Sequence, residues 1–507
     1  MEVSEGSERT MEVSEGSVAV HDFSQVIDGH PGPAASGEWL DSVDPATGAV
    51  WARVPASGAA DVDAAVDAAR RAFPAWAGLP ALQRAAHLRR IAEVLADTTH
   101  QLAEIETRDN GRVIRETLNG DLPACAQMFH YFAGAADKIH GDTVQVGSAS
   151  FNFTRREPYG VVGVIIPWNA PLSLMSAKVG AALAAGNTVV VKAAEQAACS
   201  VLAWAAHVAR AGIPPGVVNV VAGLGEEAGD ALVRHPGIGR LTFTGSTGTA
   251  RVINARGADR IRPLHFELGG KSANIVFADA DLDAAAAGIS TAAVFTGGAG
   301  QTCVAGSRIL VHESILDVVV ERVRGIAAGL RLGDPTSPET DMGPVVSAEQ
   351  LDRVRGFVEG APAEGAELLF GGRVGGDALF PADSPLAGGS WVEPTLFRVS
   401  DNDLRICREE VFGPVAVVMP FSSDEEALAL ANATTYGLAA GVWTNDLSRA
   451  HRMVRDLDAG SVWVNAYRRI HWALPFGGFG DSGYGKDSGW ESVLENTRIK
   501  TSWIEIG

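Results

Sequence analysis

Apolar positions in the first half of the chain follow two different periods, one helical and one typical of strands. Apolar residues recur at helical spacing in residues 61–73 and again in 81–96. Continuous apolar, β-branched runs at 161–166 and 188–191 are typical of strands that are buried on both faces. The same alternation continues with strands expected at 217–221 and 240–243, and helices at 201–211 and 226–233. Strands that alternate with helices predict a parallel, doubly wound sheet.

The second half repeats this pattern. Strands are expected at 274–277, 308–311 and 415–419, and helices at 314–328 and 424–431. The pattern therefore predicts a second α/β domain of comparable size. Residues 371–394 are rich in proline and glycine and are expected to form a surface loop. A cofactor and a substrate would meet in the cleft between two such domains.

Composition and charge narrow the class of protein. The chain has 507 residues, of which 46% are hydrophobic and 20% charged, as in ordinary soluble globular proteins. Its formal net charge of −20 disfavours binding to nucleic acid or to anionic membranes, so neither partner is expected. The longest apolar stretch, 161–174, contains two prolines and is too short to span a bilayer.

The four cysteines lie far apart, at Cys125, Cys199, Cys303 and Cys407. This spacing predicts neither a disulfide framework nor a metal site, and it suits a reducing compartment. The chain also lacks the basic and apolar segments of a signal peptide, so a cytoplasmic location is expected. Residues 1–20 are acidic, and residues 1–7 recur at 11–17; we interpret this leader as a mobile tail or an upstream-start artefact.

Cys303 is the candidate nucleophile, because it follows a turn that contains Gly297, Gly298 and Gly300. A free cysteine titrates near about 8.5, so it needs an environment that stabilises the thiolate. A helix that begins after the glycine-rich turn would supply one. The alternative is an inert, buried cysteine, the role assigned to the other three.

Glu267 is the candidate general base, because it ends an apolar strand-like run and precedes Gly269 and Gly270. A carboxylate in such a place is costly to bury unless it is paired or used. An ion pair with Lys271 is the structural alternative.

Further polar residues follow the predicted strands at their carboxyl ends, where doubly wound folds bind ligands. Asn169 could donate a hydrogen bond to an oxyanion, or simply form a turn. Lys192 and Glu195 could hold the two hydroxyls of a ribose, and the acid would favour NAD over NADP; a solvated ion pair is the alternative. Residues 243–247 end a strand and open a helix whose amides could meet a pyrophosphate.

Together these segments resemble the aldehyde dehydrogenase superfamily over nearly the whole chain after the leader. The resemblance is carried by short motifs in the family's order and spacing, at 167–169, 192–195, 243–247, 267–271, 300–303, 410–414 and 475–478.

The resemblance implies oxidation of a small aldehyde to its acid with reduction of NAD, or of NADP. Cys303 would attack the aldehyde to give a thiohemiacetal and then a thioester, and Asn169 would stabilise the oxyanion. Glu267 would activate the water that hydrolyses the thioester, and Lys178 would assist proton transfer. The residues implied in cofactor binding are Ile166, Trp168, Lys192, Glu195, Gly245, Ser246, Leu268, Glu410 and Phe412.

The resemblance also implies a division of the chain. Residues 21–137 and 159–266 would form the NAD-binding domain, and 267–474 the catalytic domain. A small β arm at 138–158 and the C-terminal tail at 475–507 would make a homodimer or homotetramer.

The sequence departs from the family pattern at Gly248 and Ala250, in the first turn of the presumed cofactor helix, and at Asp487, where many relatives have glutamate. A CoA-acylating dehydrogenase is the nearest alternative, although such relatives typically lack the base. A non-catalytic binding protein on the same fold is the other.

The substrate pocket is expected to use Trp168, Leu172, Phe295, Thr302, Val304 and the loop 467–474. Arg468 and Arg469 in this loop favour a carboxylate-bearing semialdehyde, whereas its aromatic residues favour an aryl aldehyde; the arginines could also face solvent.

Overall fold

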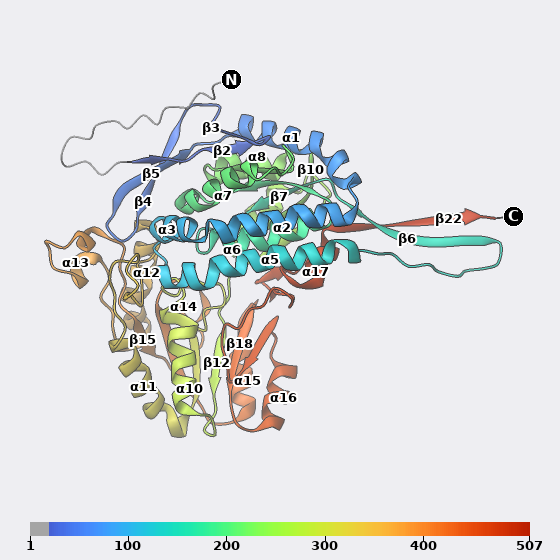
Figure 1. Ribbon diagram of the computed structural model, residues 1–507. Coiled ribbons are helices and arrows are strands. Elements are labelled where there is room, and N and C mark those ends of the chain that lie inside the picture. Colours follow the sequence, from blue (N-terminus) through green and yellow to red (C-terminus); the bar gives the residue numbers. More distant parts are fainter. Residues whose placement is uncertain (1–19, 507) are drawn as a thin grey trace, which may run out of the picture.

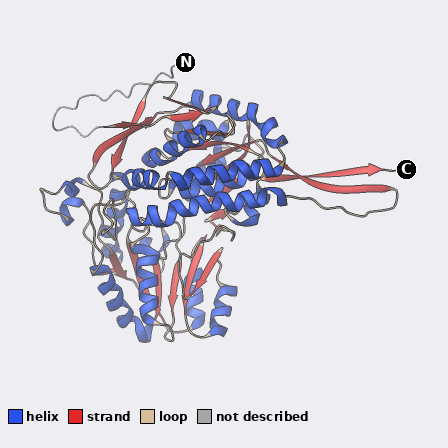
Figure 2. Cartoon of the chain, viewed as in Figure 1, coloured by secondary structure: helices blue, strands red, loops and turns tan. Residues whose placement is uncertain are grey.

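The computed structural model describes residues 20–506 and contains two large β-sheets, each covered by helices on both faces (Figures 1 and 2). The predicted leader lies, apart from its last residue, outside the described residues. The first sheet and its helices form the upper part of the molecule in Figure 1, and the second sheet forms the lower part. Within residues 20–506, every helix is too short or too polar to cross a membrane.

The first sheet has eight strands in the order β21-β11-β10-β7-β8-β9-β2-β3. Its five central strands are parallel: β7 (Val161–Ile165), β8 (Thr188–Lys192), β9 (Val218–Val221), β10 (Ile238–Thr244) and β11 (Leu264–Glu267). Antiparallel strands close the edges: β2 (Gln25–Ile27), β3 (His30–Gly32) and β21 (Gly483–Tyr484).

Alternate side chains of these central strands enter two separate hydrophobic cores, because successive residues of a strand point to opposite faces. Val161, Ile165 and Val190 pack with α1 (Ala59–Gly78), α8 (Asp230–Arg234) and α9 (Thr247–Arg256). Val162, Val164, Val189 and Val191 pack with α2 (Ala81–Asp97), α5 (Leu122–Ala135), α6 (Pro171–Ala184) and α7 (Cys199–Arg210). The predicted doubly wound sheet is confirmed.

The second sheet has seven strands, all parallel except β14 at one edge. Their order is β14 (Glu367–Phe370), β15 (Thr395–Arg398), β16 (Val415–Phe421), β13 (Arg308–His312), β12 (Ala273–Val276), β18 (Ala439–Trp443) and β19 (Ser461–Val464). One face packs on α10 (Leu282–Ala287) and α11 (Leu316–Ala328). The other packs on α12 (Ala348–Gly360), α15 (Asp424–Asn432) and α16 (Leu447–Asp456).

A long two-stranded ribbon projects from the body (Figure 1), formed by antiparallel β6 (Ser150–Pro158) and β22 (Thr497–Glu505). The tail predicted at 475–507 enters this ribbon only through β22. Residues before it turn back to the body, where β21 pairs with β11 and α17 (Gly489–Glu495) packs on α6. The segment just after residue 475 therefore belongs beside the first sheet.

The expected surface loop at 371–394 is not wholly on the surface. It contains a short helix, α13 (Gly376–Leu379), and near its end Trp391 is fully buried. The indole Nε1 of Trp391 donates to the carbonyl oxygen of Ala46 at 3.0 Å, which ties this segment to the N-terminal part of the chain. Proline and glycine content indicates turns, but it does not report burial.

Candidate functional site

One large cavity, of about 780 Å³, lies at the carboxyl ends of β7, β10 and β11 and reaches segments of the second sheet. Its volume is in the range of cavities that enclose small molecules and cofactors. It is lined by most of the residues selected from the sequence: Trp168, Asn169, Gly245, Ser246, Glu267, Leu268, Cys303, Glu410 and Phe412.

The other selected residues lie around this cavity rather than on its wall. Ile166 is buried directly after β7, and its amide donates to the carbonyl of Lys192 at 3.2 Å. Lys178 is buried within α6, behind Asp487, which does line the cavity. Lys192 and Glu195 form an ion pair at 2.6 Å, with the lysine side chain 4% exposed and the glutamate side chain 25% exposed. The pair is therefore not the solvated one that was the alternative.

Cys303 follows a turn whose backbone is held in an unusual conformation. Gly297, Gly298 and Gly300 have φ of 71°, 75° and 73°, and Ala299 between them has φ of 54°. At Gly300 a Cβ atom would lie 2.2 Å from the carbonyl oxygen of Gly413, so only glycine fits there. The carboxylate of Glu116 accepts from the amides of Gly297 and Gly298 at 2.5 and 3.0 Å and fixes the turn.

A helix that begins after the glycine-rich turn would stabilise a thiolate, but residues 301–307 form turns and irregular backbone before β13. The pKa of the Cys303 thiol is accordingly not lowered. Burial, together with the neighbouring Glu267 and Glu410 carboxylates, raises this pKa to about 12.

Asn169 is held against the cysteine segment. Its Nδ2 donates to the carbonyl oxygen of Gln301 at 2.9 Å, and Gln301 in turn is fixed by Val346, whose amide donates to Oε1 at 2.9 Å. The Asn169 amide is therefore held in a fixed orientation by Gln301, the residue that precedes the candidate nucleophile by two positions. The bond to Gln301 uses one of the two N–H groups of this amide, and Asn169 and Cys303 both line the cavity.

Glu267 ends β11 as expected and is almost completely buried, with 3% of the residue exposed. Its ion-pair alternative with Lys271 does not form. Among the described residues, the basic side chain within 4.0 Å of the carboxylate is the imidazole of His265, whose Nε2 lies 3.5 Å from Oε1. The other oxygen, Oε2, is buried without a hydrogen-bond partner among these residues. Burial raises the pKa of this carboxyl well above its ordinary value, and Asp487 raises it further.

A buried polar network lies behind Glu267. Lys178 Nζ donates to Thr242 Oγ1 at 3.0 Å and to Asp487 Oδ2 at 2.8 Å. His265 Nδ1 lies 3.1 Å from the same Thr242 oxygen. The sequence analysis did not select Thr242 or His265. Both are polar residues within apolar strands, and they are direct partners in the β10–β11 register, which is the signal that could have indicated them.

Two parts of the cavity wall, the N-terminus of α9 and Glu410, have groups suited to bind a dinucleotide. The first turn of α9 lines the cavity, with Ser246 as N-cap accepting from the amide of Thr249 at 3.1 Å. A Cβ atom at Gly248 would meet nothing closer than 3.8 Å, so this helix N-terminus is open to a phosphate. Glycine at this position therefore leaves the helix intact while keeping its N-terminus accessible.

Glu410 is the second part of the wall suited to a dinucleotide. Its Oε1 accepts from the amide of Gly270 at 3.1 Å, and a Cβ atom at Gly269 would lie 2.2 Å from Oε2. The carboxyl is thus held in a cradle that only glycine permits, on the cavity wall, where it can accept from the hydroxyls of a ribose. Burial raises its pKa to about 7.

The remaining wall of the cavity comes from helices and loops of both halves of the chain. These residues include Arg112, Asp121, Met128, Thr302, Val304, Arg468, Ile470 and Trp472. Two residues expected here are elsewhere. Leu172 is on α6 and points into the core of the first half. Phe295 is in the core of the second sheet, where its ring centroid lies 6.2 Å from that of Phe370. Arg468 lines the cavity, whereas the exposed Arg469 does not.

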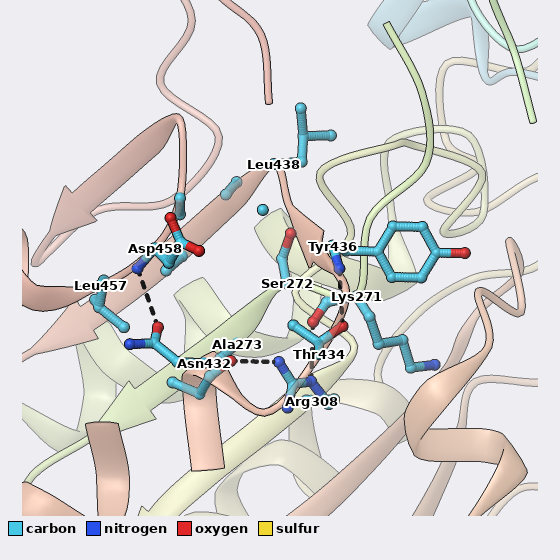
Figure 3. A pocket seen from close by; sticks show the side chains of 15 residues that line it. Lys271, Ser272, Ala273, Arg308, Asn432, Thr434, Tyr436, Leu438, Leu457 and Asp458 are labelled. Carbon is cyan, nitrogen blue, oxygen red and sulfur yellow. Dashed lines mark hydrogen bonds between the residues drawn. The ribbon is translucent and has the colours of Figure 1, made fainter. Parts of the chain in front are cut away.

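A second cavity, next to Lys271 in the other half of the molecule, is much smaller (Figure 3). Its volume of about 10 Å³ is enough for roughly one water molecule. Arg308 beside it donates to the carbonyl oxygens of Lys271, Leu430 and Ala431 at 2.9, 2.8 and 2.7 Å. The last two carbonyls lie at the C-terminus of α15, where a cation is favourable, so this cluster stabilises the fold.

Comparisons with known proteins show the family of this chain. The model of the aldehyde dehydrogenase family matches residues 33–502. The putative aldehyde dehydrogenase DhaS of Bacillus subtilis is 40% identical over 482 residues, which is 95% of each chain. The crystal structure of a putative aldehyde dehydrogenase from Burkholderia cenocepacia is 45% identical, with a TM-score of 0.92, over 96% of this chain and 97% of that one. The NAD+ complex of an aldehyde dehydrogenase from Bacillus cereus is 40% identical, with a TM-score of 0.92, and the match covers 96% and 97% of the two chains.

Proposed function

Because this chain belongs to the aldehyde dehydrogenase family and oxidises an aldehyde with reduction of NAD(P), we propose that its reaction uses Cys303 as nucleophile and Glu267 as general base. The observation that carries the proposal is that both side chains line one cavity, and that Glu267 Oε2 is buried without a hydrogen-bond partner among residues 20–506. A buried acceptor without a donor is suited to take a proton from a bound water.

In the proposed reaction the Cys303 thiol gives its proton to water in the cavity as its sulfur bonds to the aldehyde carbon, and the carbonyl oxygen becomes an oxyanion. The Asn169 amide and the backbone N–H of Cys303 stabilise this charge. NAD(P), when bound, supplies the acceptor for the hydride. The acyl group then remains on sulfur as a thioester.

Glu267 completes the reaction. It takes a proton from water, the water oxygen bonds to the thioester carbon, and the carbon–sulfur bond breaks. The carboxylic acid leaves, and the sulfur regains its proton. Since Glu267 selects water as acceptor, we favour this reaction over transfer of the acyl group to CoA.

The matched pair Glu267→Gln and Cys303→Ala tests the assignment by rapid mixing with an aldehyde and NAD. Glu267→Gln keeps the shape of the side chain but cannot accept the proton. We expect a normal first burst of NADH, followed by steady-state turnover that is lower by about 10²–10⁴-fold. Cys303→Ala should produce neither the burst nor turnover.

Unchanged turnover in Glu267→Gln would remove this residue from the base role. Addition of CoA is the control for the alternative acceptor, because stimulation without formation of free acid would indicate an acylating enzyme. NAD binding without NADH production from any aldehyde would indicate a non-catalytic protein.

For the cofactor, we propose that α9 holds the pyrophosphate, Glu410 one ribose, and the Lys192–Glu195 pair the adenosine ribose. The glutamate is expected to repel a 2′-phosphate, which favours NAD over NADP. Burial lowers the pKa of Lys192, and the adjacent Glu195 opposes this effect and supports the charged form.

We also propose a homodimer or homotetramer in the cytoplasm. The β6–β22 ribbon exposes several large apolar side chains, namely Phe151, Ile499, Trp503 and Ile504. A monomer rarely exposes such a group of side chains on a projecting ribbon without a partner. The four cysteines are free, and three of them are buried, which suits a reducing compartment.

A further inference from the structure

His265 occupies an unusual position for a histidine, at the end of an apolar strand and within reach of the proposed base. It precedes Glu267 by two residues on β11, so both side chains point to the same face of the sheet. It is 3% exposed. Its Nε2 lies 3.5 Å from Glu267 Oε1, a long hydrogen-bond distance, and its Nδ1 lies 3.1 Å from Thr242 Oγ1.

The two neighbours of the ring decide which of its nitrogens carries the proton. An ionised Glu267 carboxylate only accepts, so the ring nitrogen that faces it, Nε2, carries the proton. Nδ1 is then the acceptor, and it lies 3.1 Å from Thr242 Oγ1, whose hydroxyl can donate to it. The same Thr242 oxygen accepts from Lys178 Nζ at 3.0 Å, because lysine has only donors.

The competing partner of Nδ1 is Asp487, whose Oδ1 is 3.8 Å away and thus outside hydrogen-bond distance. Its other oxygen accepts from Lys178 at 2.8 Å. Asp487 therefore holds the lysine and leaves Nδ1 to the threonine.

The surrounding backbone makes room for this ring. At Gly485, with φ of 89°, a Cβ atom would lie 2.5 Å from His265 Cδ2. At Gly477 it would lie 2.3 Å from Glu267 Oε1. Both glycines belong to the C-terminal segment that closes over β11, so the imidazole and the carboxylate are confined side by side.

The charged groups around the ring favour its neutral form. Burial lowers the pKa of His265 well below its ordinary value, and Lys178 from α6, Arg240 from β10 and Lys486 lower it further. The acidic groups near the Glu267–His265 pair are Asp487 and, from α17, Glu495. A neutral ring has one donor and one acceptor nitrogen, so with the proton on Nε2 it donates to Glu267 and accepts from Thr242.

We propose that His265 is a positioning residue for the Glu267 base: the Thr242 hydroxyl, held by Lys178, donates to Nδ1 and supports the tautomer whose Nε2–H donates to Glu267 Oε1. The proposal rests on the proposed function of Glu267. The donated hydrogen bond favours the carboxylate and leaves Oε2, the oxygen without a partner, to accept the proton from water. His265 thereby sets the lowest pH at which thioester hydrolysis proceeds.

The test is the pH profile of deacylation, measured as steady-state turnover after the NADH burst. His265→Leu removes the donor, so the acid limb should move to higher pH by about one unit. His265→Gln supplies an amide N–H at a similar distance from the backbone. In this variant the acid limb of the pH profile should lie closer to its wild-type position than in His265→Leu. The size of the burst reports acylation and should stay unchanged in both variants.

Thr242 provides a second, smaller change that tests the same chain if His265→Leu does not fold. Thr242→Val removes the hydroxyl that selects the tautomer and should move the limb in the same direction, whereas Thr242→Ser should keep it. An acid limb that coincides with the wild type in a folded His265→Leu, or in Thr242→Val, overturns the proposal. Failure of the base assignment is seen separately, as full turnover in Glu267→Gln.

Discussion

Cys303 and Glu267 share one physical problem, which is that burial opposes the charged form of each. The pKa of the thiol rises to about 12 and that of the carboxyl rises well above its ordinary value. The charge on Glu267 also disfavours a thiolate at Cys303. Attack by sulfur therefore requires stabilisation of the developing oxyanion at the same moment, which gives the Asn169 amide and its fixed orientation their importance.

Glu106 is a second carboxyl whose pKa is raised by burial, although it does not line the cavity. It lies on α3 (Thr99–Asn110), is fully buried, and has Oε2 bonded to the Ser200 hydroxyl at 2.9 Å, while Oε1 has no partner among the described residues. Burial, aided by Asp121, raises its pKa from 4.5 to about 7. A raised pKa means that the folded state binds the proton more tightly than the unfolded state.

This shift predicts a pH-dependent stability. The contribution of Glu106 is fully present below about pH 4.5 and is lost as the pH rises through about 7, with a total of about 3 kcal/mol. Glu106→Gln stays neutral, so its free energy of unfolding should fall less than that of the wild type between pH 4.5 and 8. Denaturant unfolding across this range measures the difference. Parallel curves for the two proteins would contradict the prediction.

At the scale of elements, the ends of strands and the segments after them bring the site together. β7, β10 and β11 end at the cavity, while the cysteine turn and the segment 467–474 reach it from the second sheet. The sequence left open whether Arg468 and Arg469 face the substrate. The structure separates them, because Arg468 lines the cavity and Arg469 is exposed outside it.

This separation predicts that substitution of Arg468, but not of the neighbouring Arg469, changes the substrate preference of the enzyme. Arg468 forms no ion pair within 4.0 Å among residues 20–506. The nearby Asp121 lies on the same cavity wall and is itself paired with Arg112 at 2.7 Å; burial raises the pKa of this carboxyl, and Arg468 opposes that rise. The Arg468 charge can therefore also meet an aldehyde that carries a carboxylate. Arg468→Ala should raise the KM for such a semialdehyde about tenfold relative to a neutral aldehyde of the same length. Arg469→Ala is the matched control and should leave the ratio unchanged. Equal effects of Arg468→Ala on both substrates would exclude this role.

At the scale of the whole molecule, the ribbon of β6 and β22 exposes large apolar side chains that no other part of the described chain covers. Ile499 and Trp503 are 61% and 57% exposed and lie four residues apart on one strand, so they point to the same face. Burial of such side chains in another subunit would stabilise an oligomer.

Ile499→Asp combined with Trp503→Asp should therefore reduce the molar mass in solution, measured by light scattering after size-exclusion chromatography. Two buried charges in a subunit interface would be costly without partners. Arg498→Ala, at an exposed neighbouring position, is the control and should keep the wild-type mass. A wild-type monomer, or a double variant with unchanged mass, would show that the ribbon does not mediate assembly.

The local pattern of residues in the sequence was enough to predict the buried strands and the family of this protein. The β-branched runs at 161–165 and 188–191 specified strands buried on both faces, because an apolar residue at every position leaves no side for solvent. The motifs around Asn169, Glu267 and Cys303 also indicated the family, which the comparisons confirm. Such features depend on neighbours in sequence, and a single chain displays them directly.

Only the tertiary structure decided the chemical environment of these residues. The sequence suggested a helix to activate Cys303 and Lys271 as partner of Glu267; instead, the thiol lies in a turn, and the carboxylate faces His265. The hydrogen-bonded chain behind it joins residues from α6, β10, β11 and the C-terminal segment. A pKa and a hydrogen-bond partner depend on burial and on charges far away in sequence, and these are set only when the chain folds.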